Sequence, residues 1–178
     1  MVLSLLLLVG CLKQPAAVQA TTPEAVAVGA VLTSVDDGAT AAFSEAAMSR
    51  VSAVIQARNL SVRPVPPEHL QAQPAGPYRL AALLQDAGDA PLRLLIEADA
   101  RFFSQMNGQY RWTVELTLTL SPSREGATAQ IDHVEVPVFL QYDHEGEPEA
   151  LMAALPVLER RLGTLLDQRN RAERAGGN

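Results

Sequence analysis

The chain has 178 residues, which is enough for one domain with one hydrophobic core, and its single cysteine excludes an intrachain disulfide. Its formal net charge of -6 excludes a nucleic-acid binder that works by neutralising phosphates. We therefore expect a single folded unit that is stabilised by packing.

The first eleven residues form the most distinctive segment. An apolar run from Val2 to Val9, with Ser4 as its one polar member, leads into Leu8-Val9-Gly10-Cys11. The run is too short to cross a bilayer as a helix, and it suits the apolar core of a signal peptide although no Lys or Arg precedes it. The alternative, a buried strand or helix, does not usually stand at the start of a chain and end in Gly-Cys.

That tetrapeptide resembles the lipobox of bacterial lipoproteins, in which one cysteine is lipidated and becomes the new N-terminus. The resemblance implies a signal peptide over residues 1–10, a lipid on Cys11 and attachment to a membrane through that lipid. Leu12 stands where an Asp favours retention in the inner membrane, so we expect the periplasmic face of the outer membrane.

The remaining boundaries follow from composition. Residues 11–23 contain the cysteine and a proline-bearing stretch without apolar periodicity, which predicts a flexible linker. Residues 24–168 are expected to form a single domain. Residues 169–178 are polar and end in Gly-Gly-Asn, which predicts a disordered tail.

The first half of the domain alternates between short apolar runs and helical patterns. Residues 25–33 and 60–65 have the length and composition of strands. Between them, an Ala-rich segment with an apolar stripe predicts a helix over 39–58, which Asp36 or Asp37 would cap at its N-terminus. Pro77 suits the first turn of a second, short helix.

Two segments, 92–103 and 110–121, show the clearest pattern. Even-numbered positions are apolar and nearly all odd-numbered positions are polar, which predicts two strands with one dry and one wet face. A two-residue Asn107-Gly108 loop would set even positions opposite odd ones, so we expect a three-residue loop, 106–108, with a bulge and a positive φ at Gly108. Phe102 would then lie opposite Trp112.

The last two elements complete the fold. Residues 130–142 continue the same alternation and predict a third strand. Because Pro137 has no N–H to donate, either this strand lies at an edge or the backbone nitrogen of Pro137 points away from the neighbouring strand. Pro148 opens a leucine-striped helix that Pro156 should kink or divide. We expect an α/β chain of the α+β two-layer-sandwich type, with a mixed sheet of about five strands that ends in an antiparallel meander. All the helices should pack on one face.

The motifs of common enzymes and metal sites are missing. His69, His133 and His144 do not stand in metal-ligand spacing, and the cluster around His144 is best explained as a polar turn. The carboxylates of Glu97, Asp99 and Glu115 share the wet face, where no cleft is expected to perturb them. We therefore predict no catalytic residue, no metal and no cofactor, and a protein that is not an enzyme.

The wet face is the remaining candidate for function. It carries Arg93, Arg101 and Arg111 together with Phe103, an apolar residue where polar ones dominate. Isolated aromatic residues often anchor partners, so these four positions are the candidate partner-binding residues. The alternative is an ordinary solvated sheet face.

Residues 25–168 resemble several bacterial envelope lipoproteins. The resemblance rests on the strand–helix–strand start, on YRLAALLQDAG leading into PLRLLIEADARFF, on YRWTVELTLTL and on the final EALMAALPVLERRLGTLL. The families are the curli-secretion lipoprotein, the penicillin-binding-protein activator, the N-terminal domain of the Tol translocation protein and the lipopolysaccharide-assembly lipoprotein. They imply a lipid-anchored, non-enzymatic scaffold or accessory subunit with an envelope protein partner. A carrier or sensor of a small or lipidic ligand, held between sheet and helices, is the alternative.

Overall fold

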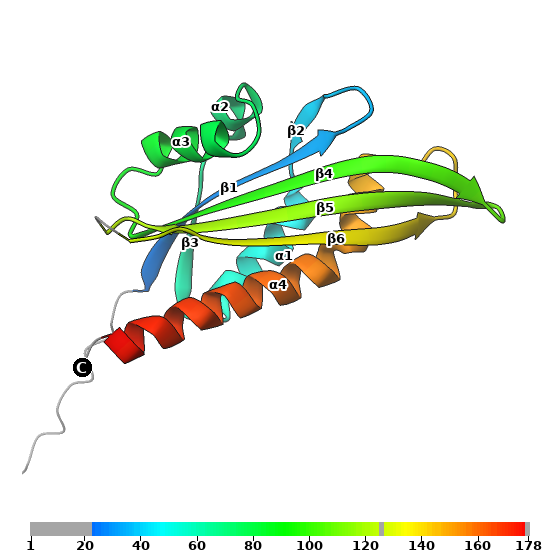
Figure 1. Ribbon diagram of the computed structural model, residues 1–178. Helices are drawn as coiled ribbons and strands as arrows, with labels where there is room; N and C mark the ends of the chain where they lie inside the picture. Colours follow the sequence, from blue (N-terminus) through cyan, green and yellow to red (C-terminus); the bar gives the residue numbers. More distant parts are fainter. Residues whose placement is uncertain (1–22, 125–126, 177–178) are drawn as a thin grey trace, which may run out of the picture.

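The computed structural model describes residues 23–124 and 127–176 (Figure 1). The predicted signal peptide, the predicted lipidation site Cys11 and most of the predicted linker therefore lie outside the described residues. The strands are β1 (Glu24–Ser34), β2 (Thr40–Ala42), β3 (Leu60–Pro64), β4 (Leu92–Met106), β5 (Gln109–Pro122) and β6 (Gln130–Leu140). The helices are α1 (Glu45–Gln56), α2 (Pro67–Gln71), α3 (Pro77–Asp86) and α4 (Glu147–Gly176).

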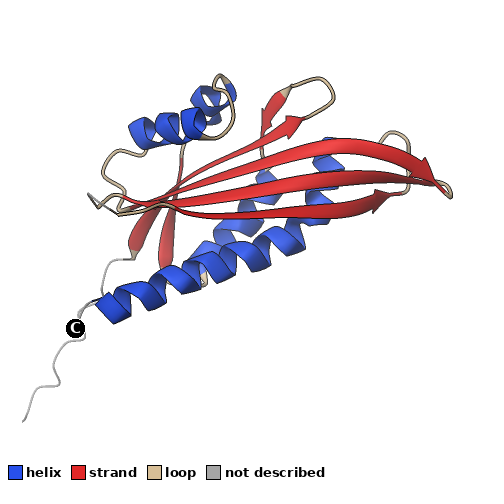
Figure 2. Cartoon of the chain, viewed as in Figure 1, coloured by secondary structure: helices blue, strands red, loops and turns tan. Residues whose placement is uncertain are grey.

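The six strands form one mixed sheet, and two long helices pack on one of its faces (Figures 1 and 2). The strand order is β2-β1-β4-β5-β6, with β3 also paired to β1, and the meander β4-β5-β6 is antiparallel. The even-numbered strand residues pack against α1 and α4, and this core includes Leu94, Leu116 and Leu158. The predicted fold class is confirmed.

The two short helices depart from the prediction that all the helices pack on one face. Helices α2 and α3 lie against the opposite face of the sheet, above β1 and β4 in Figure 1. There Leu70 and Leu83 form a second cluster with odd-numbered strand residues, among them Leu95. Gly29 makes this close approach possible, because a Cβ at that position would lie 2.5 Å from Cδ1 of Leu70. The odd face is thus covered at its β1 end.

The β4–β5 hairpin closes through a two-residue turn, so the predicted three-residue loop is wrong. Met106 pairs with Gln109, and Asn107 and Gly108 have φ values of 52° and 76°, as a type I′ turn requires. Phe102 nevertheless pairs with Trp112, because a bulge at residue 103 restores the register. The predicted pairing is therefore confirmed, with its irregularity moved from the turn into the strand.

The start of α1 also differs from the prediction. Asp37 caps a tight turn between β1 and β2, where its Oδ1 accepts a hydrogen bond from the backbone N–H of Ala39 at 2.8 Å. That hydrogen bond lowers the pKa of the Asp37 carboxyl. The helix begins only at Glu45, and Ser44 caps it by accepting from the N–H of Ala47. The Asp side chain favours the turn because it can bond its own backbone two residues on.

Strand β6 lies at the edge of the sheet, the first of the two arrangements predicted from Pro137, and α4 follows it. Helix α4 runs from Glu147 to Gly176 through Pro156 without being divided. Residues 169–176 are helical, so the predicted tail is wrong over that stretch. The reason is Arg169, which is buried and bonds Glu24 at 2.8 Å and Glu173 at 2.6 Å.

Two ion pairs fix α4 against α1 and the turn that follows it. The guanidinium of Arg50 in α1 pairs with Glu159, and that of Arg58, in the turn after α1, pairs with Asp167 at 2.8 Å, two turns further along α4. The hydrogen bond from Arg58 lowers the pKa of the Asp167 carboxyl.

Candidate docking face

The odd face of the sheet is only half covered, and the uncovered half is the candidate functional site. Helices α2 and α3 cover Leu95 and Glu97, which are the buried odd residues of β4. Beyond Glu97 the odd face of β4, β5 and β6 is exposed or half-buried. We call this region the open half-face. It is defined by Asp99, Arg101, Phe103, Arg111, Thr113, Glu115, Glu135, Pro137 and Phe139.

Three carboxylates lie side by side across the open half-face. Asp99 of β4 lies opposite Glu115 of β5, and Glu115 lies opposite Glu135 of β6. We call this set the carboxylate row. Within residues 23–124 and 127–176, no cationic group lies within 4.0 Å of any of the three. Like charges that face each other across strands are destabilising, so the row weakens the isolated sheet.

An apolar group lies further along the same face, toward the hairpin. Phe103 is 60% exposed, Phe139 is 53% exposed and Met106 is 52% exposed. Arg111 pairs with Phe139 in the register, and its guanidinium carbon lies 4.4 Å from the centre of the Phe103 ring. This cation–π contact places the arginine between two exposed aromatic rings.

Three of the four predicted partner-binding residues come together here. Arg101, Phe103 and Arg111 line one small hollow of about 130 Å³, whose other walls include the carboxylate row. Arg93 does not join them, since it lies at the far end of β4 and donates to the carbonyl of Gly88 at 3.4 Å.

Glu97 departs from the sequence-based expectation. It was predicted on the wet face, but its side chain is only 6% exposed and pairs with Arg79, itself 4% exposed, at 3.2 Å. The same guanidinium donates to Thr33, to Thr40 and to the carbonyl of Gln73. The N–H of Gly76 also donates to the Glu97 carboxylate.

This network ties α3 to the sheet, and it was missed because nothing near Glu97 in the sequence indicates the arginine that covers it. Arg79 lies 18 residues earlier and belongs to a different element. Its position in an otherwise leucine-rich helix was the one available signal.

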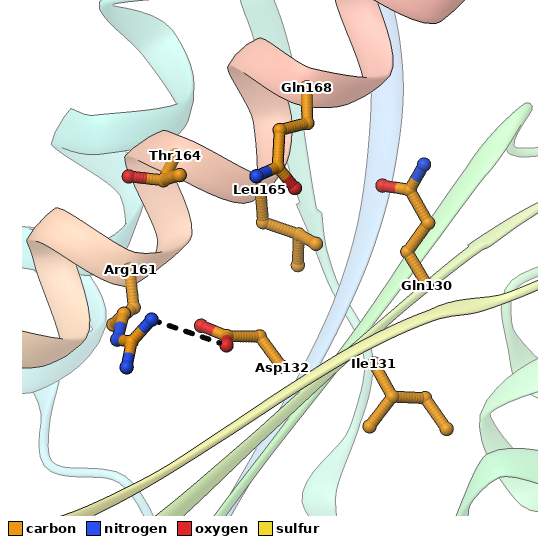
Figure 3. A pocket seen from close by; sticks show the side chains of 7 residues that line it. All are labelled: Gln130, Ile131, Asp132, Arg161, Thr164, Leu165 and Gln168. Carbon is orange, nitrogen blue, oxygen red and sulfur yellow. Dashed lines mark ion pairs between the residues drawn. The ribbon is translucent and has the colours of Figure 1, made fainter.

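Two hollows between α4 and the sheet test the alternative of a ligand carrier. One, of about 370 Å³, lies between α4 and β6, where Arg161 pairs with Asp132 at 3.5 Å (Figure 3). Gln130, Thr164 and Gln168 also line it, while Ile131 points away from the helix. The other, of about 590 Å³, is more apolar and lies near Pro91 and Pro122.

Neither hollow has the enclosed apolar form that suits a lipidic ligand. Among the described residues, no three His, Cys, Asp or Glu side chains are placed to hold a metal ion. No helix in the described part of the chain is both long enough and apolar enough to span a membrane.

The fold and the site define a small α+β domain that buries one sheet face under two helices and leaves half of the other exposed. No known protein family matches the sequence, and neither does any curated protein. Among solved structures, the chain is similar to lipoprotein GNA1162 from Neisseria meningitidis, with 16% identity over 78% of this chain and 99% of that one, and a TM-score of 0.45.

The PelC dodecamer from Paraburkholderia phytofirmans is similar at 16% identity, over 80% of this chain and 88% of that one, with a TM-score of 0.40. Rare lipoprotein B from Shewanella oneidensis is similar at 11% identity, over 84% and 96%, with a TM-score of 0.30.

Proposed function

We propose that this protein is a lipid-anchored, non-enzymatic accessory subunit or scaffold of a bacterial cell-envelope complex. In this proposal the lipid on Cys11 holds the domain at the periplasmic face of the outer membrane. The domain then binds a partner protein on its open half-face. The lipobox-like segment supports the anchor, and the geometry of the sheet supports the binding surface.

The observation that carries the proposal is the exposed apolar group on the half of the sheet face that α2 and α3 leave uncovered. Phe103, Met106 and Phe139 each leave half or more of the side chain in solvent. Aromatic residues and methionine are enriched in protein–protein interfaces, and arginine is as well. Arg111, held against the Phe103 ring, therefore completes a composition typical of an interface.

The test is co-purification of partners with a variant that disrupts the open half-face. Full-length protein carrying Phe103→Ser and Phe139→Ser should lose its partner from detergent-solubilised envelopes, while its melting temperature stays close to wild type, because both side chains are exposed. The matched control is Tyr78→Ser with Ile131→Ser, which removes two exposed apolar side chains outside the open half-face.

Quantitative mass spectrometry compares the partners that each variant retains. A partner that is lost from the open-face variant and kept by the control supports the proposal. Retention of every partner by the folded open-face variant contradicts it.

A further inference from the structure

We infer that the segment bound on the open half-face presents a basic side chain to the carboxylate row and an apolar side chain to Phe103 and Phe139. This inference rests on the proposed function and adds the chemistry of the partner. The occupant is a segment of a partner protein that carries Lys or Arg.

The first argument is the charge of the row. Adjacent strands lie about 4.8 Å apart, so the carboxylates of Asp99, Glu115 and Glu135 form a compact negative strip. The two arginines of the same hollow leave the row without an ion pair. Arg111 lies over the Phe103 ring, and Arg101 has no carboxylate within 4.0 Å in the part of the chain that the structure describes. A cation from outside would relieve the repulsion between the three groups.

The second argument comes from the covered half of the same face. There a segment of this chain, α3, brings Arg79 onto Glu97 at 3.2 Å and Leu83 onto the apolar residues of β1 and β4. Asp99 is the next odd residue along β4 after Glu97. The covered half thus shows that one helix with an arginine and a leucine fits this face. The open half offers a partner the same two kinds of contact, a carboxylate for a basic side chain and an apolar surface for an apolar one.

The third argument concerns where the partner sits. Glu135 and Phe139 are four residues apart on β6, which separates the row from the aromatic pair by roughly 13 Å in an extended strand. The open edge of β6 is a poorer site for strand addition, because Pro137 has no N–H to donate. The partner is therefore expected on the face, with its basic and apolar side chains separated by that distance.

The experiment places a photo-crosslinking phenylalanine derivative at position 139 of the full-length protein in intact cells. Phe139 is exposed and aromatic, so this replacement is conservative. A second protein carries the same probe together with Glu115→Gln and Glu135→Gln, which keep the side-chain shape and remove two charges of the row. The matched control carries Glu45→Gln in α1 and Glu68→Gln in α2, two exposed carboxylates that lie outside the open half-face.

We expect an adduct with a partner protein whose cross-linked region carries Lys or Arg. The adduct should fall by about tenfold in the protein with Glu115→Gln and Glu135→Gln, because two exposed charge pairs with the partner are lost, and it should stay unchanged in the control. The protein with these two glutamines should melt at the same temperature as wild type or higher, since the repulsion between like charges is reduced. That result separates lost binding from lost folding.

Three outcomes overturn the inference while leaving a docking face in place. They are an adduct that is insensitive to the glutamine substitutions, a cross-linked region without Lys or Arg, and an adduct with lipid or with a second copy of this chain. The absence of any adduct at position 139 counts against the proposed function itself. The two ideas therefore fail in different ways.

Discussion

The buried pair of Arg79 and Glu97 allows a sharp test of how α3 is held on the sheet. Replacing Arg79 by Met removes the guanidinium and keeps most of the apolar stem. Glu97 then keeps only the hydrogen bond from the N–H of Gly76 and remains a buried charge without a counter-ion among the described residues. Because both side chains are at least 94% buried, solvent screens the loss very little.

The expected cost of Arg79→Met is about 3–5 kcal/mol of unfolding free energy, the range for breaking one partner of a buried pair. Replacing both residues, Arg79→Met with Glu97→Leu, removes the two charges together and should cost far less than the sum of the single changes. Urea denaturation of the four proteins of this cycle measures the coupling. Hydrogen exchange in α2 and α3 shows whether these helices are released before the rest of the domain.

A loss below about 1 kcal/mol in Arg79→Met would refute the reasoning, since that is the size of a surface pair. A double variant that is as unstable as the sum of the two single variants would refute it as well. In that case the two side chains contribute independently to the free energy of unfolding, and their ion pair is not what holds α3 on the sheet.

The remaining predictions concern close approaches, the turn, the anchor and acid lability. Gly29→Val should cost about 1–3 kcal/mol in urea denaturation by overpacking the leucines of α2 and α3, and a variant as stable as wild type would contradict this. Gly108→Val should cost about 2 kcal/mol because of its positive φ, and an unchanged melting temperature would contradict the type I′ turn. Cys11→Ala should abolish labelling by a palmitate analogue, and equal labelling of both proteins would exclude that anchor. The stabilising effect of the Arg58–Asp167 pair should be complete above the ordinary Asp pKa of 3.8 and be lost as the pH falls through the lowered one. Asp167→Asn should therefore be less stable at neutral pH and lose less stability on acidification in melting experiments.

The hairpin shows how far sequence patterns reach and where they stop. Period-two alternation predicted both strands and the pairing of Phe102 with Trp112, because burial of one face fixes which residues can oppose each other. The same reasoning showed that the hairpin must contain one extra, unpaired residue, and it placed that residue in the turn. Asn-Gly favours a two-residue type I′ turn, because both residues readily adopt the positive φ that this turn requires. The extra residue is therefore Phe103, which forms a bulge within the strand.

The candidate site was predictable only in part, for a different reason. Alternation assigns Glu97 and Asp99 to the same face, and the structure agrees, yet one is buried and the other is only half-buried. The difference arises from α3, whose contact with the sheet depends on Arg79 and Gly29. Local patterns carry no information about which half of a face a distant helix will cover.

The boundary between the two halves lies between successive odd residues of β4, and this gives the strongest reason to regard the open half as functional. On the covered side, the carboxylate of Glu97 is satisfied by a guanidinium and a backbone N–H. On the open side, Asp99 begins a row of three carboxylates that has no counter-ion within 4.0 Å among the described residues. Selection for stability alone would favour replacing one of the three by a neutral residue, because repulsion across strands is easily relieved. A surface that keeps an unfavourable charge pattern beside exposed aromatic rings is best explained by a partner that completes it.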